Sequence, residues 1–122
     1  MLIEYRQHAA ERAALGIPPL PLSALQTSAL IELLKAPAPQ DGEFLVELLS
    51  QRVPAGVDDA ARVKASWLAA LAFGSERCAL VSPRRAVQLL GTMLGGYNIH
   101  PLVELLKHDT LGADAAQALK HT

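Results

Sequence analysis

The spacing of the helix-start signals constrains the fold more than any other feature of this sequence. Ser23 with Gln26 forms a capping-box pattern, Asp58 precedes a second apolar segment, and Asn98 precedes a third. These starts lie roughly 35 and 40 residues apart, which leaves room in each interval for two helices and a turn. Intervals of this length are typical of solenoids built from stacked helical hairpins.

Glycine and proline divide the chain into segments of helical length, because both residue types end helices. The expected helices cover residues 2–15, 23–34, 41 to just before 54, 58–74, 82 to the glycine pair at 95–96, about 98–107, and from after Gly112 through 122. Asp41 should cap the third helix, and Ser82 with Pro83 should open the fifth. We expect the apolar, proline-rich residues 17–22 to lie against the body of the domain.

The composition favours helices over strands. The chain has 122 residues, of which 51% are hydrophobic and only 4% aromatic, and alanine and leucine dominate the apolar set. We therefore expect one domain over residues 1–122, an all-α α-solenoid of about three helical hairpins with six to seven helices. No glycine or proline ends the last expected helix, and solenoids need a polar capping repeat, so we expect a domain truncated at its C-terminal end from a longer protein.

Residues 91–101 form the most specific stretch. We expect a helix to end at Gly95-Gly96 and the next to begin at Asn98, whose side-chain oxygen should accept from the following amides. Residues 91–101 thus form a tight corner between two helices, and this corner also carries Tyr97 and His100. Tyr97 could pack on the neighbouring hairpin or anchor an interface, and His100 could bond to the backbone or face a partner.

No catalytic, cofactor or metal site can be recognised. The single Cys78 excludes an internal disulfide and a multi-cysteine metal centre, and the histidines show no helical pair with a third ligand. No segment has the length and apolarity of a membrane span, and charged residues at the N-terminus argue against a signal peptide. We expect a cytoplasmic protein without a membrane partner.

A pair of arginines stands where a helix dipole disfavours positive charge. Arg84 and Arg85 follow the expected cap at Ser82, and Arg77 lies nearby in sequence. They could form a solvated face or a basic patch for an acidic partner domain or an RNA backbone, although the formal net charge of −1 gives no global attraction to nucleic acid. With the corner residues, the candidate interaction surface comprises Arg77, Arg84, Arg85, Tyr97 and His100.

Four segments carry a family resemblance: residues 5–14, 30–35, 52–58 and 89–102, the last reading LLGTMLGGYNIHPL. Their order and spacing resemble the amino-terminal domain of the bacterial aconitate hydratase B family. The resemblance implies a HEAT-like helical domain that precedes the catalytic domains. It also implies that the whole enzyme, a hydro-lyase, interconverts citrate and isocitrate through cis-aconitate in the tricarboxylic acid cycle, and often acts on 2-methylisocitrate. The 4Fe-4S cluster of that enzyme has its cysteines far downstream, and Cys78 matches none of them.

The resemblance therefore implies a non-catalytic domain that serves protein–protein association, including dimerisation, and shapes access to the active site. Its expected partners are the downstream catalytic domains of the same polypeptide, a second copy in a homodimer, and messenger RNA. The alternative is a free-standing helical-repeat module that binds protein or RNA. An enzyme in its own right would need a site that the residues do not provide, and the gene sequence beyond Thr122 would separate the first two readings.

The arginine pair generates a test. Replacing both residues, Arg84→Glu with Arg85→Glu, should weaken partner or RNA binding without lowering the melting temperature, because both arginines are expected at the surface. Binding should be measured at low salt, where electrostatic contacts are strongest. Equal affinity of the variant and the unaltered chain under these conditions would contradict the basic-patch hypothesis.

Overall fold

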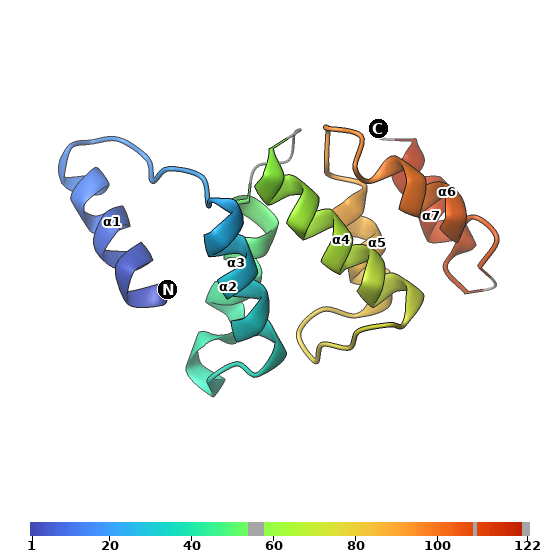
Figure 1. Ribbon diagram of the computed structural model, residues 1–122, viewed down its shortest axis with the longest axis horizontal. Coiled ribbons are helices and arrows are strands. Elements are labelled where there is room, and N and C mark those ends of the chain that lie inside the picture. The colour runs from blue at the N-terminus through green and yellow to red at the C-terminus, as the bar shows by residue number, and fades with distance from the viewer. Residues whose placement is uncertain (54–57, 109, 121–122) are drawn as a thin grey trace.

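The computed structural model describes residues 1–53, 58–108 and 110–120, and every regular element in these ranges is a helix. Three pairs of helices stand side by side and α1 lies apart at one end (Figure 1). The elements are α1 (Leu2–Ala14), α2 (Ala24–Lys35), the 3-10 helix η1 (Pro39–Asp41), α3 (Gly42–Gln51), α4 (Asp59–Phe73), α5 (Pro83–Leu90), α6 (Ile99–Leu105) and α7 (Gly112–Leu119). The all-α prediction is confirmed.

The pairs are the expected hairpins. Helices α2 and α3, α4 and α5, and α6 and α7 pack against each other, and the hairpins stack through contacts of α2 with α4 and of α5 with α7. Their inner faces consist mainly of leucine and alanine. Leu30, Leu49, Leu68, Leu90 and Leu102 on these faces are each 0% exposed. Burying one such leucine stabilises a fold by about 2 kcal/mol, so the stack is held by apolar contact between neighbouring hairpins.

Two helix starts form as predicted. The Ser23 hydroxyl accepts from the Gln26 amide at 3.2 Å while the Gln26 side chain accepts from the Ser23 amide at 2.9 Å, which completes the capping box. The Ser82 hydroxyl accepts from the Arg85 amide at 3.1 Å, with Pro83 in the first turn. The local sequence is sufficient for these starts because all the groups involved lie within four residues.

The predicted cap at Asp41 is wrong. The turn η1 precedes α3, so Asp41 already has helical backbone angles and its side chain makes no capping bond. Its carboxylate lies instead 3.5 Å from the Arg6 guanidinium of α1. The Arg6 guanidinium also lies 4.7 Å from the ring centroid of Phe44, and the buried Tyr5 packs beside the same ring. These contacts attach α1 to the first hairpin.

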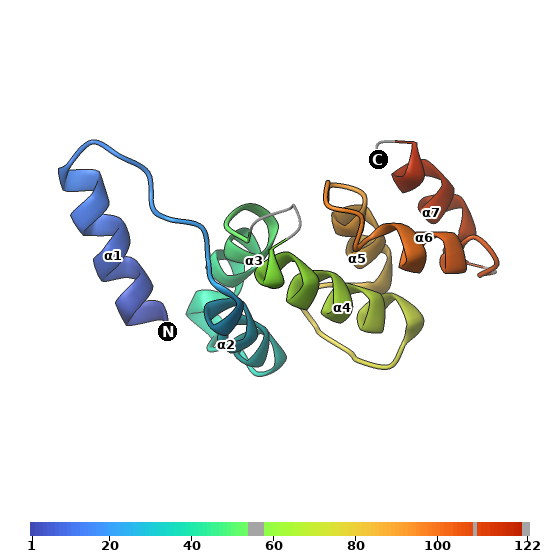
Figure 2. The ribbon, with the colours of Figure 1, turned by 45° about the horizontal axis from the view of Figure 1, so that its top comes forward.

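The prediction that residues 17–22 lie against the body of the domain holds in part. Leu22 is 2% exposed and its amide donates to the Arg52 carbonyl at 2.8 Å, and Pro19 and Pro21 line a hollow beside the end of α3. Ile17 and Leu20 are 39% and 54% exposed where the segment passes from α1 to α2 (Figure 2). Hydrogen bonds from the Leu20 amide to His8 Nε2 and from Arg12 Nε to the Pro18 carbonyl also tie the segment to α1.

The corner between the second and third hairpins differs from the prediction. Helix α5 ends at Leu90, five residues before the glycine pair, and Asn98 has helical backbone angles with no capping bond from its side chain. The Asn98 side chain is buried, and its amide nitrogen donates to the Leu90 carbonyl at 2.7 Å and to the Met93 carbonyl at 3.2 Å. Asn98 thus satisfies carbonyls at the end of α5 rather than amides at the start of α6.

Close packing requires a glycine directly after α5. A Cβ atom at Gly91 would lie 2.8 Å from the Cβ atom of Ala118, so α7 approaches the backbone too closely for any side chain there. The last two helices are shorter than predicted, since α6 ends at Leu105 and α7 at Leu119. The predicted continuation of α7 through residues 121–122 lies outside the described residues.

Replacing Asn98 by aspartate tests this role. The carboxylate of Asn98→Asp has nearly the same shape but cannot donate to two carbonyl oxygens, so the variant should lose about 2–4 kcal/mol of unfolding free energy at neutral pH. Denaturant unfolding followed by circular dichroism measures the loss. Because a protonated carboxyl group regains one donor, the loss should shrink as the pH falls, and an unaltered stability at neutral pH would contradict the role of Asn98.

Candidate interaction surface

The five predicted surface residues fall into two groups. Arg84 and Arg85 lie in the first turn of α5, and Arg77 lies in the loop before it, where it lines the same hollow as Pro83. Tyr97 and His100 lie beyond the other end of α5, at the start of α6. Helix α5 has 8 residues, so about 12 Å of helix separates the two groups. The structure does not bring them into one site.

Arg84 has a partner within the chain. Its Nε atom lies 3.1 Å from the Asp114 carboxylate of α7, and this pairing explains a cation at the start of a helix. Arg85 donates to the Gln88 side chain at 3.2 Å and, like Arg77, is exposed. The sequence predicts that the double substitution leaves the melting temperature unchanged. That expectation applies only to Arg85→Glu, because Arg84→Glu would place two carboxylates next to each other at Asp114. An exposed ion pair of this kind contributes about 0–1 kcal/mol.

Exposed apolar side chains surround the corner residues. Ile99, Val103 and Leu106 follow one another at helical spacing and are 39%, 45% and 44% exposed, and we name them the α6 apolar face. Leu94 and Tyr97, which are 80% and 37% exposed, lie in the turn before it. Exposed apolar side chains that gather in one segment mark an interaction site in many proteins.

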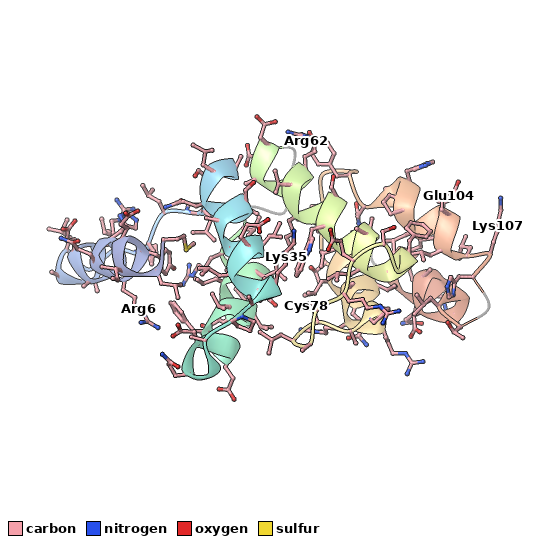
Figure 3. All side chains as sticks on the ribbon, turned by 60° about the horizontal axis from the view of Figure 1, so that its bottom comes forward. Arg6, Lys35, Arg62, Cys78, Glu104 and Lys107 are labelled. Atoms are coloured by element: carbon pink, nitrogen blue, oxygen red, sulfur yellow. The ribbon has the colours of Figure 1, made fainter. Side chains whose placement is uncertain are left out.

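Sequence reasoning missed the α6 apolar face, although a signal was present. Leu102 and Leu105 are fully buried on the opposite side of the same short helix. A helix that is apolar on two faces needs a partner on each, and the spacing of the apolar residues in this segment already predicts two faces. The polar side chains Glu104 and Lys107 of the same segment are exposed and point away from the molecule (Figure 3).

Lys64 of α4 is the other functional candidate that sequence reasoning missed. It is 1% exposed and lies between buried alanines and leucines of the same helix. Burial lowers the pKa of its ammonium group to about 8, because a low-dielectric environment disfavours the charged form. The sequence did contain a signal of this burial. Lys64 lies four residues before Leu68 and seven before Leu71, so it shares the helix face that these two core leucines occupy.

The residues of this chain do not fit an iron–sulfur cluster. A cubane cluster requires three or four thiolates, and the chain contains one cysteine. Cys78 is half-buried in the loop before α5, beside the end of α2 (Figure 3), and its thiol donates to the Leu34 carbonyl at 3.3 Å. Nor do any three His, Cys, Asp or Glu side chains gather to hold a metal ion in the described ranges. Within those same ranges, every helix is too short or too polar to cross a membrane.

The buried ammonium of Lys64 predicts an unusual pH dependence. The folded-state pKa lies below the ordinary value of 10.5, so the unfolded chain binds more protons between these values and stability rises with pH there. Relative to Lys64→Met, the unaltered chain should gain about 2–3 kcal/mol of unfolding free energy from about pH 7 to about pH 10. Denaturant unfolding at several pH values measures the difference, and Lys107→Met, at an exposed site, should show no such change.

Comparison with known proteins identifies the family. The family model described as the aconitate B N-terminal domain matches residues 4–122. Aconitate hydratase B of Salmonella typhimurium is 59% identical over 122 residues, that of Escherichia coli 57%, and that of Helicobacter pylori 44% over 123 residues. These matches cover 99–100% of this chain but only 14% of each relative. The chain belongs to the family of aconitate hydratase B amino-terminal domains.

Proposed function

We propose that this chain is the non-catalytic association domain of an aconitate hydratase B. In this proposal the whole polypeptide interconverts citrate and isocitrate in the cytoplasm, with a 4Fe-4S cluster held by residues outside this chain. The helical stack contributes surface rather than reacting groups. It associates with the catalytic domains of its own polypeptide and with a second subunit, and so shapes access to the active site.

The observation that carries this proposal is the α6 apolar face. Ile99, Val103 and Leu106 expose apolar surface at the end of the solenoid that the catalytic domains would follow in sequence. The turn before it adds Leu94 and Tyr97, and aromatic side chains with an apolar surround are frequent interface anchors. Burying this surface against another domain or subunit would remove it from water.

Messenger RNA is a weaker candidate partner. The ion pair of Arg84 with Asp114 leaves Arg77 and Arg85 as the cations of the predicted patch, and phosphate-backbone binding generally draws on more positive charge. The same argument weakens the alternative of a free-standing RNA-binding module.

Charged substitutions on the α6 apolar face test association. In the whole polypeptide, Val103→Asp with Leu106→Asp should reduce the mass measured by sedimentation equilibrium to that of a single subunit, because two carboxylates cannot be buried unpaired in an interface. The stability of this chain should change by no more than about 0.5 kcal/mol per exposed site. The matched control is Leu25→Asp, at an 85% exposed position of α2, which should leave the mass unchanged.

Two results would contradict the proposal. An unchanged mass in the doubly substituted protein would exclude this face from the subunit interface. Aconitase activity in the isolated 122-residue chain would overturn its non-catalytic role.

A further inference from the structure

A hollow of about 350 Å³ lies where the end of α3 meets α4, the proline-rich segment and the corner. Among the residues that the structure describes, its lining consists of Pro19, Pro21, Ser50, Gln51, Arg52, Val53, Lys64 and Thr92. Two of these described residues are cationic and none of them is acidic. The hollow is separate from the α6 apolar face and from the arginines of α5.

Two donors in this hollow, on Lys64 and Ser50, lack partners among the described residues. Lys64 is 1% exposed and makes no hydrogen bond or ion pair with any described residue. The Ser50 hydroxyl is also buried, and no described group bonds to it. Burying an ammonium group and a hydroxyl without partners is costly, so natural proteins usually satisfy such groups with an ion, a water molecule or a ligand.

Arg52 adds a second cationic side chain, on a backbone that hydrogen bonds hold in place. Its backbone amide donates to the Leu48 carbonyl at 2.9 Å and its carbonyl accepts from Leu22, which fixes the residue between α3 and the proline-rich segment. Its half-buried guanidinium has no partner among the residues that the structure describes. The positive charge of Arg52 is favourable because it lies at the C-terminal end of α3, where the helix dipole is negative. The dipole does not explain why Lys64 of α4, which is also a cation, is buried in the same hollow.

We infer that this hollow binds a small oxyanion of the carboxylate or phosphate class, held by the Lys64 ammonium, the Ser50 hydroxyl and the Arg52 guanidinium. Such an anion supplies acceptors to these donors, and charge-assisted hydrogen bonds to it are strong. The volume suits a molecule the size of a phosphate or a short dicarboxylate. The anion is either free in solution or an Asp or Glu side chain from elsewhere in a longer polypeptide.

Titration with inorganic phosphate and with succinate tests the inference. In the 122-residue chain, either anion should shift the nuclear magnetic resonance signal of the Lys64 ε-methylene group saturably, whereas sodium chloride at equal ionic strength should not. Lys64→Met keeps the length of the side chain and removes the charge, so it should weaken binding at least about tenfold by calorimetry. Ser50→Ala should weaken it a few-fold, and Lys107→Met, at an exposed site, should have no effect.

The result distinguishes the two sources of the anion. Binding by both the 122-residue chain and the longer polypeptide would support a free anion, whereas binding by the chain alone would support a carboxylate side chain that already fills the hollow in the longer polypeptide. Circular dichroism of each variant confirms that it folds. Absence of a saturable shift in the unaltered, folded chain, or equal affinity of Lys64→Met, would overturn the inference.

Discussion

Close packing around α4 is the constraint on which the rest of the structure depends. This helix contacts α2 in the hairpin before it, α5 in its own hairpin and α6 in the next. Alanines at positions 60, 61, 65 and 72 are buried on it, and their small side chains let neighbouring helices approach closely. Leu68 and Leu71 fill the space between them. Because α4 is buried on several sides, it transmits the geometry of one hairpin to the next.

The same burial gives Lys64 its importance. A lysine on an exposed helix has no special chemistry, but on α4 it places a cation where water is largely excluded. The proline-rich segment adds a wall to this site through Pro19 and Pro21, and the amide of Leu22 anchors that segment to the end of α3. A solenoid core and an anion-binding hollow thus arise from one packing arrangement.

The corner connects packing to the proposed association. Asn98 ties the end of α5 to the start of α6, and Gly91 admits α7 against the end of α5. These contacts orient α6 so that Leu102 faces the stack while Val103 faces outward. The corner therefore connects two hairpins at a fixed orientation. In the proposed association, its contribution is to set the direction in which the α6 apolar face points.

The sequence by itself determined the helical class, the three hairpins and their order. Capping groups such as Ser23 and Ser82 act within a few residues, and apolar periodicity requires no knowledge of the partner face. It also determined the family, through segments whose order covers the whole chain. Trp67 lies four residues before Leu71 in an apolar helical segment, a spacing that indicates a core position, and it is 6% exposed.

Only the tertiary structure decided how groups far apart in sequence meet. The pairing of Arg84 with Asp114 spans 30 residues and that of Arg6 with Asp41 spans 35. Asn98 bonds backward to carbonyls of the preceding helix and corner, which a local capping rule cannot anticipate. The burial of Lys64 depends on the packing of α3, α4 and the proline-rich segment together. Local signals specify where helices begin, whereas burial and long-range pairing depend on how the completed helices pack.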